Sequence, residues 1–286
     1  MFREPKLVYS QARDVRLALW EWPGAEPPLV FVHATGFHGR CWDEVIAHFP
    51  DQRCLAVDMR GHGRSDKPAP PYHWRAFGED LAALLHAHDM RGAVGIGHSM
   101  GGHSVTLAAA LVPEIWSQLV LLDPVILPPE RYTGPHPVEH FAARRRNRWS
   151  SPDEMIARFA PRPPFNRWQP AVLRDYCAYG LLPAPDGGGY VLACPPQIEA
   201  DIYRNSTAAN IYHEIAQVRV PVTVVRMGQP TVLDAWNMEG SPTAPDLAAI
   251  FSHGRDLHIP EYTHFMPMES PERVANIIRE ALHGND

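Results

Sequence analysis

The chain has 286 residues, of which 45% are hydrophobic and 20% are charged, and its formal net charge is −6 at pH 7. This composition is typical of a globular protein with a sizeable core, and the acidic balance argues against a nucleic-acid-binding surface. The first residues lack the apolar segment of a secretory signal, and no apolar run approaches the roughly 20 residues that cross a bilayer. The four cysteines form no CxxC pair, so we expect reduced thiols in a cytoplasmic protein without membrane contacts.

Short apolar runs alternate with helical patterns along the first half of the chain. The predicted strands are residues 15–20, 29–32, 54–58, 93–97 and 119–122. A helix is predicted over residues 77–88, which carry an apolar leucine stripe, and another over the alanine-rich residues 100–112. Strands that alternate with helices predict βαβ units and a mostly parallel sheet.

The alternation stops after Asp123. Fourteen of the 30 prolines lie between Pro124 and Pro196, yet the same stretch is rich in aromatic residues, which a disordered linker lacks. We therefore expect a folded insertion of short helices and loops over residues 128–211, with the core formed by residues 1–127 and 212–286. The core continues with predicted strands at 222–226 and 257–259 and predicted helices at 245–252 and 271–282.

The strongest local signal is GHSMGG, residues 97–102. It matches GxSxG, follows an apolar run and precedes a helix, which is the context of a nucleophile elbow. Gly97 and Gly101 leave room where a side chain would clash in the sharp turn, and the turn presents the hydroxyl of Ser99. Ser99 is therefore the predicted nucleophile.

A serine hydroxyl needs a base that accepts its proton. Of the 16 histidines, His264 lies just beyond the last predicted strand, where a loop brings it to the edge of the sheet, so we predict that it is the base. The histidines beside other motifs are interpreted as packing or hydrogen-bonding residues: His33, His62, His98 and His103. No HExxH motif or ligand cluster is present, so no metal site is predicted.

Five motifs together resemble the α/β-hydrolase superfamily in their order along the chain: HATGFHGRCWDEV, DMRGHGRSDKP, GHSMGG, LVLLDPV and THFMPMESPERVA. The resemblance covers essentially the whole core. It implies an α/β fold with a mostly parallel eight-stranded sheet flanked by helices, and a helical lid inserted after the sixth strand. It also implies an oxyanion hole made by the amides of Met100 and Thr35. Ala34 stands where the family usually has glycine.

The acid of the expected triad has two candidates. Most family members carry it after the strand predicted at 222–226, but this chain has Thr231 at the expected position and Asp234 three residues later. Asp123 ends the strand that follows the nucleophile helix, and some branches of the family resemble this chain in having their acid there. We predict Asp123, with Asp234 as the alternative.

The insertion contains AARRRNRW, residues 142–149. Its arginines point in several directions around a helix, so a solvated, salt-bridged face is the preferred interpretation, with attraction of an anionic substrate as the alternative. The aromatic residues nearby either line an apolar pocket or pack within the insertion: Trp149, Trp168, Tyr176 and Tyr179.

The sequence thus predicts a serine hydrolase that cleaves a carboxylic ester or lactone through an acyl-enzyme, without a cofactor. The expected partner is a small apolar or aromatic substrate. A carbon–carbon bond hydrolase, an amidase or a perhydrolase with the same triad remains open. A slow or non-catalytic ligand receptor on the same scaffold is the alternative from another class, and turnover would separate the two.

Overall fold

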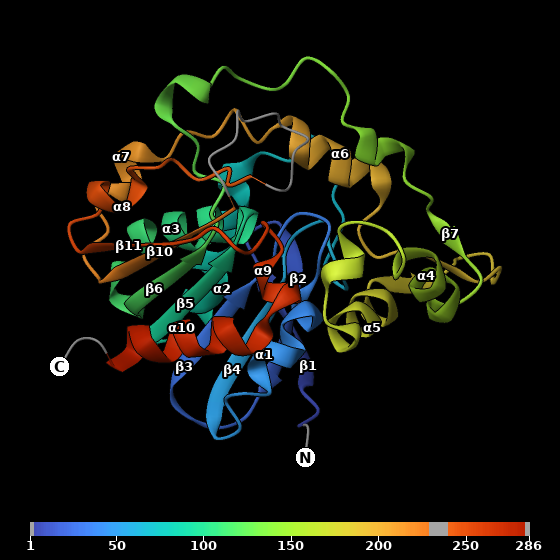
Figure 1. Ribbon diagram of the computed structural model, residues 1–286, viewed down its shortest axis with the longest axis horizontal. Coiled ribbons are helices and arrows are strands. Elements are labelled where there is room, and N and C mark those ends of the chain that lie inside the picture. The colour runs from blue at the N-terminus through green and yellow to red at the C-terminus, as the bar shows by residue number, and fades with distance from the viewer. Residues whose placement is uncertain (1–2, 229–239, 284–286) are drawn as a thin grey trace.

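The computed structural model describes residues 3–228 and 240–283. Its central feature is an eight-stranded sheet of order β1-β2-β4-β3-β5-β6-β10-β11 (Figure 1). The strands are β1 (Lys6–Ala12), β2 (Val15–Trp22), β3 (Ala25–Val32), β4 (Gln52–Asp58), β5 (Ala93–His98), β6 (Trp116–Leu122), β10 (Val222–Met227) and β11 (Gly254–Ile259). β1 and β2 pair antiparallel, β2 pairs antiparallel with β4, and the other neighbours pair parallel. The predicted α/β fold with a mostly parallel eight-stranded sheet is confirmed.

The strand β1 is absent from the sequence prediction, which begins the sheet at residue 15. Its residues are exposed or half-buried except for Ala12, because the strand lies at the sheet edge and pairs only with β2. An edge strand needs little apolar burial, so it gives a weak hydrophobic signal. β3 and β6 also begin earlier than predicted.

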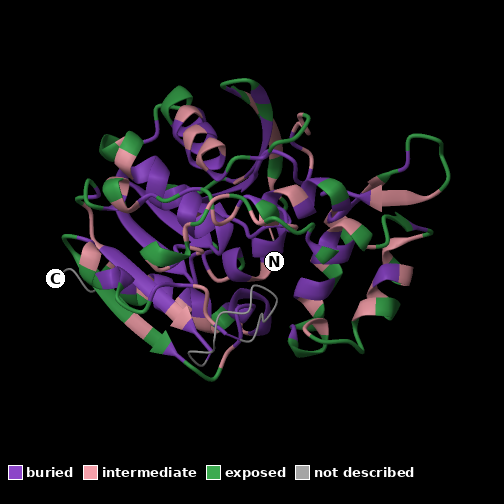
Figure 2. Cartoon of the chain, turned by 90° about the horizontal axis from the view of Figure 1, so that it is seen from above, coloured by how far each residue is buried: buried purple, intermediate pink, exposed green. Residues whose placement is uncertain are grey.

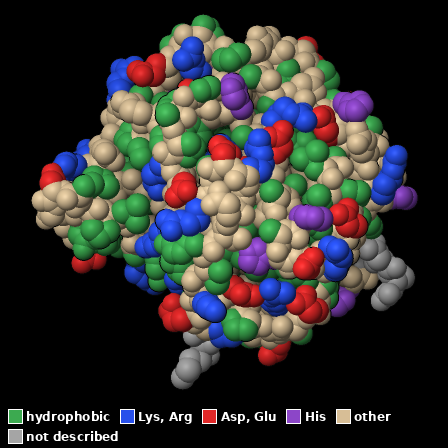
Figure 3. Space-filling view, turned by 180° about the vertical axis from the view of Figure 1, so that it is seen from behind, with side chains coloured by type: hydrophobic (Ala, Val, Ile, Leu, Met, Phe, Trp, Pro, Cys, Tyr) green, Lys and Arg blue, Asp and Glu red, His purple; other side chains and the backbone are tan. Residues whose placement is uncertain are grey.

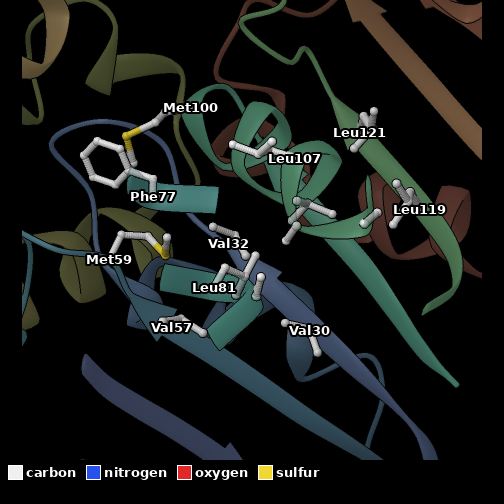
Figure 4. Packing of buried hydrophobic residues seen from close by; sticks show 14 of the residues in the cluster. Val30, Val32, Val57, Met59, Phe77, Leu81, Met100, Leu107, Leu119 and Leu121 are labelled. Atoms are coloured by element: carbon white, nitrogen blue, oxygen red, sulfur yellow. The ribbon is translucent and has the colours of Figure 1, made fainter. Parts of the chain in front are cut away.

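Helices cover both faces of the sheet. α2 (Trp74–Ala87) and α3 (Met100–Leu111) lie on one face, and α1 (Asp43–Ile46) and α10 (Pro271–His283) on the other. Successive side chains of a strand point to opposite faces, so Val30 and Val32 pack with α2 and α3, while Phe31 packs with α1 and α10. Figure 4 shows Val30, Val32 and Val57 facing Leu81 and Leu107, within the apolar layer between the sheet and the helices α2 and α3.

Three of the four predicted helices of the core are present with similar bounds, and the fourth is reduced to a single turn. α3 and α10 agree with the predicted ranges to within one residue, whereas α2 begins three residues earlier than expected. In place of the predicted helix at 245–252 there is a single turn, α8 (Leu247–Ile250). The short helices α7 (Tyr212–Ile215) and α9 (Met266–Glu269) complete the core.

The segment between β6 and β10 contains helices and, contrary to the prediction of helices and loops alone, a second sheet of order β7-β9-β8. The strands are β7 (Arg148–Trp149), β8 (Leu181–Pro183) and β9 (Tyr190–Leu192). They are only two or three residues long, too short to give a period-two pattern. The glycines at 187–189 form the turn between β8 and β9, where Gly187 and Gly189 have positive φ angles.

Prolines begin the three longer helices of this segment, α4 (Pro152–Phe159), α5 (Pro170–Tyr179) and α6 (Pro196–Arg204). Proline is tolerated at the first helical position because that N–H has no intrahelical acceptor. The segment projects to one side of the sheet, and its exposed and buried residues are interleaved (Figure 2). In the part of the chain that the structure describes, no helix combines the length and hydropathy needed to cross a bilayer.

Candidate active site

Ser99 lies in the turn between β5 and α3 with φ 57° and ψ −119°. A residue other than glycine in such a backbone conformation costs about 1–3 kcal/mol, so surrounding contacts must hold it there. The amide of Ser99 donates to the carbonyl of Leu122 (3.1 Å), and its carbonyl accepts from the amide of Val125 (3.1 Å). The elbow is thereby bonded to β6 and to the chain that follows it.

The glycines of the elbow are needed for space. A Cβ on Gly97 would lie 2.5 Å from the carbonyl oxygen of Gly101, and one on Gly101 would lie 2.1 Å from that of Val32. Both contacts are with backbone, which has no flexible end to move aside. The predicted nucleophile elbow therefore has the close packing that its glycines imply.

Asp123 and His264 come together from two different strand ends. Asp123 follows β6, His264 lies in the loop after β11, and Asp123 Oδ2 is 2.6 Å from His264 Nδ1. Asp123 is fully buried and His264 is 3% exposed. An ionised carboxylate can only accept, so Nδ1 carries the proton and Nε2 is left as the basic nitrogen.

Further bonds hold the carboxylate of Asp123. Its Oδ1 accepts from the amide of Met227 (3.2 Å), from Thr243 Oγ1 (3.3 Å) and from Ser241 Oγ. These donors compensate the buried charge and leave Oδ2 directed at the imidazole. Of the two predicted acids, the structure thus brings Asp123 to His264, whereas Thr231 and Asp234 lie outside the described residues.

The loop that carries His264 is anchored on both sides. His98, next to Ser99, donates from Nε2 to the carbonyl of His264 (2.7 Å). On the other side, Glu269 accepts from Thr263 Oγ1 (2.6 Å) and from the amide of Thr263 (3.2 Å). Burial, with a contribution from His264, lowers the pKa of His98 well below its usual range, so this ring is a neutral donor. The sequence left packing and hydrogen bonding both open for His98, and the structure shows the hydrogen bond and its partner.

The loop with Thr35 is held by two neutral histidines. His33 donates from Nδ1 to the carbonyl of Ala34 (2.7 Å) and accepts from the amide of Met59 (3.0 Å). His62 accepts from the amide of Gly36 at Nε2 (3.0 Å). Burial lowers the pKa of both imidazoles, which keeps these nitrogens free to accept.

Thr35 and Met100, the predicted oxyanion donors, are both buried. Met100 is the first residue of α3, so its amide has no intrahelical acceptor and lies at the positive end of the helix dipole. Thr35 also lines a cavity, and its hydroxyl is buried with no hydrogen-bond partner among the described residues. An orphaned polar group in a cavity wall is available to a ligand.

This cavity has a volume of about 350 Å³ and lies between the Thr35 loop and the segment between β6 and β10. Most of its wall is apolar: Phe37, Phe141, Phe159, Pro163, Pro164, Phe165, Trp168 and Phe265. Trp168 and Tyr176 line it, as one of the two sequence interpretations expected. Trp149 instead packs within the segment, and the ring of Tyr179 stacks on the Arg40 guanidinium at 3.9 Å.

The arginine stretch separates into two kinds of side chain. Arg146 and Arg148 form ion pairs at the surface with Glu154 and Asp186, as the solvated interpretation expected. Arg145 departs from that interpretation, because it lines the cavity and contacts Glu199 there. The residues form a one-turn helix followed by extended chain, and this geometry turns Arg145 inward.

The comparisons with known proteins agree with this architecture. A sequence profile of the Alpha/beta hydrolase family matches residues 29–277. The 3-oxoadipate enol-lactonase 2 of Acinetobacter baylyi is 28% identical over 232 residues, which are 76% of this chain and 81% of the lactonase. The crystal structure of E-2-(acetamidomethylene)succinate hydrolase superimposes with a TM-score of 0.79 at 21% identity, over 97% of this chain and 99% of that one.

Other similarities are local. The non-heme chloroperoxidase of Streptomyces lividans is 44% identical over 80 residues, which are 27% of this chain and 29% of the chloroperoxidase. Two further curated relatives are matched over 36% and 40% of their length, so this chain spans less than half of each of these three relatives. The profile match covers most of the chain, and the protein belongs to the alpha/beta hydrolase family.

Proposed function

We propose that the protein is a serine hydrolase that cleaves a carboxylic ester or lactone through an acyl-enzyme on Ser99. The observation that carries this proposal is the 2.6 Å contact between the buried Asp123 and His264, whose backbone carbonyl is bonded to His98, the residue before the strained Ser99. The similarity to an enol-lactonase over most of both chains supports a lactone or ester as the bond cleaved.

In the first half of the reaction, Ser99 Oγ attacks the carbonyl carbon while His264 Nε2 accepts its proton. The carbonyl oxygen becomes an oxyanion, which the amides of Thr35 and Met100 stabilise. Asp123 orients the imidazole and stabilises its charged form. The bond to the alcohol oxygen then breaks, the proton passes from Nε2 to that oxygen, and acyl-Ser99 remains.

In the second half, a water molecule attacks the acyl-enzyme as Nε2 accepts a proton from the water. The same two amides hold the second oxyanion. When the bond to Ser99 Oγ breaks, Nε2 returns the proton to that oxygen, and the carboxylic acid leaves. The cycle uses only side chains and amides of this chain, and the proposal includes no cofactor and no metal.

The segment 128–211 is the proposed lid, and the aromatic cavity beneath it is the proposed binding site for an apolar or aromatic part of a small substrate. The mostly apolar, ring-lined wall favours such a group because its burial is stabilising. On the face in Figure 3 basic and acidic side chains are interspersed, which supports a small-molecule substrate over a nucleic acid.

The four unpaired, buried cysteines support a reducing, cytoplasmic location.

The test is labelling with a fluorophosphonate probe, followed by identification of the labelled peptide. Wild type is expected to be labelled at Ser99, and Ser99→Ala and His264→Ala to remain unlabelled while still folded by circular dichroism. A panel of esters and lactones then gives kcat. Absence of labelling in folded wild type would contradict the proposal, and labelling with turnover far below about 1 per second would favour a receptor.

A further inference from the structure

Two charged side chains from different parts of the proposed lid meet in the wall of the cavity. Arg145 follows the one-turn helix Phe141–Arg144, and Glu199 lies on α6. Arg145 Nη1 contacts Glu199 Oε2, and Nη2 donates to the hydroxyl of Tyr176 (2.9 Å). The side chain of Glu199 is 6% exposed and that of Arg145 is 21% exposed.

The pair lies against the loop of the predicted oxyanion hole. A Cβ built on Gly36 would be 2.7 Å from Glu199 Oε1 and 2.9 Å from its Cδ. Gly36 follows Thr35, which lines the same cavity. The carboxyl of Glu199 therefore lies against the loop that carries Thr35, one of the two predicted oxyanion donors. A buried carboxylate there needs a compensating positive charge.

The described residues that line the cavity carry no other charge at neutral pH. Burial, together with His136, lowers the pKa of His140 to about 4, so this imidazole is neutral. Burial raises the pKa of Tyr176 to about 12. Burial also raises the pKa of Glu199, while the contacting Arg145 guanidinium acts in the opposite direction. The close contact of the two side chains has the geometry of an ion pair. One positive and one negative charge leave this wall with a net charge of zero.

A neutral wall discriminates between substrates. A carboxylate on the substrate would lose its hydration, and its attraction to Arg145 would be offset by repulsion from Glu199. An uncharged acceptor such as an amide or ketone oxygen has no such penalty. Arg145 has five N–H donors, of which the side chains of Glu199 and Tyr176 take one each among the described residues.

On the basis of the proposed function, we propose that Glu199 is a specificity-determining residue. By neutralising Arg145 it selects substrates whose group in the cavity is uncharged and carries a hydrogen-bond acceptor, and it excludes substrates with a carboxylate at that position. The preference depends on the net charge of the pair. Removal of the negative charge should therefore favour carboxylate substrates, and removal of the positive charge should disfavour them further.

The test compares pairs of esters that differ only in the charge of one end. p-Nitrophenyl adipamate and mono-p-nitrophenyl adipate place an amide or a carboxylate in the acyl part. para-Acetoxybenzamide and para-acetoxybenzoate place the same two groups in the alcohol part, which covers both orientations in the cavity. For each pair, kcat/KM is measured after subtraction of the uncatalysed rate.

Wild type is expected to prefer the amide member by at least about tenfold in one of the two pairs. Glu199→Gln leaves Arg145 uncompensated, and the preference is expected to reverse toward the carboxylate member. Arg145→Gln leaves Glu199 uncompensated and strengthens the preference for the amide. The double variant Arg145→Gln/Glu199→Gln restores a neutral wall and a ratio close to that of wild type.

Glu154→Gln is the matched control, because Glu154 also pairs with an arginine of the same stretch but lies at the surface. It is expected to leave both ratios unchanged. The inference is overturned if wild type prefers the carboxylate member in either pair, or shows no preference in both. It is also overturned if Glu199→Gln, folded by circular dichroism, keeps the wild-type ratio. If Glu199→Gln does not fold, the inference is tested by comparing the kcat/KM ratios of the double variant and wild type, which are expected to be close.

Failure of the proposed function has a different signature. If folded wild type hydrolyses none of the four esters, the hydrolase proposal fails, and the inference is decided by binding. Quenching of tryptophan fluorescence by benzamide and by benzoate measures binding directly, because Trp168 lines the cavity. Tighter binding of benzamide that reverses in Glu199→Gln supports the inference, and equal or tighter binding of benzoate by wild type overturns it.

Discussion

His98 Nε2 donates a 2.7 Å hydrogen bond to the backbone carbonyl of His264, and the two imidazole rings lie 4.9 Å apart between centroids. The residue that precedes the proposed nucleophile thus holds the loop that carries the proposed base. Through this contact the elbow at the end of β5 and the loop after β11 keep a fixed relative position. We therefore expect the alignment of Ser99 and His264 to depend on this contact, because small displacements in an active site reduce rates strongly.

Replacement of His98 is expected to affect catalysis more than binding. His98→Phe keeps a ring of similar shape but removes the donor to His264, so kcat should fall by about tenfold while KM changes little. His103→Phe is the control, because His103 is equally buried and donates to the distant carbonyl of Ala209. Equal losses of kcat in the two variants would contradict a positioning role for His98.

Asp123→Asn tests the acid of the proposed triad. The amide cannot hold Nδ1–H as a carboxylate does, so kcat should fall by about 10³ to 10⁴. Asp234→Asn should remain within about twofold of wild type, as is usual for a residue outside the triad. Activity assays on both variants, with melting curves to verify folding, distinguish the two acids. A large loss in Asp234→Asn alone would assign the role to Asp234.

The pH dependence of stability should report on His103. Burial lowers its pKa from 6.5 to about 4. Between these values the unfolded chain binds a proton that the folded chain does not, so the histidine stabilises the fold above pH 6.5 and loses this contribution as the pH falls toward 4. Urea unfolding at several pH values measures the free energy of unfolding, which should decline as the pH falls from 6.5 toward 4. In His103→Phe this decline should be smaller by up to ~3 kcal/mol. Parallel curves for the two proteins would refute this assignment.

Gly101→Ala should disrupt the elbow. Its Cβ would approach the backbone oxygen of Val32 to 2.1 Å, so β3 and α3 must separate, at a cost of at least ~2 kcal/mol in the free energy of unfolding. Gly188→Ala is the control, because its Cβ meets only side-chain atoms, at 3.3 Å and beyond, and its φ is not positive. Denaturant titrations compare the two variants. Similar stability of both would show that the elbow relaxes more readily than its geometry implies.

Much of the core could be predicted from local sequence. The alternation of apolar strands with helices is a property of neighbouring residues, and it predicted the mostly parallel sheet that the structure contains. The glycines at 97 and 101 identified the elbow: a Cβ on Gly97 would meet the turn itself, whereas one on Gly101 would meet the backbone of β3. The edge strand β1 and the two-residue strand β7 were missed, since an exposed or very short strand leaves little hydrophobic periodicity.

The amino-acid sequence by itself determined the position of the Ser99 elbow, through its GxSxG motif, and the order of strands and helices, through periodic burial. Only the tertiary structure decided that Asp123 faces His264 and that Arg145 meets Glu199. Asp123 and His264 are separated by 141 positions and Arg145 and Glu199 by 54, so no local pattern relates them. Their contacts arise where strand ends and the inserted segment converge, and the low polarity of that buried region gives the contacts their strength.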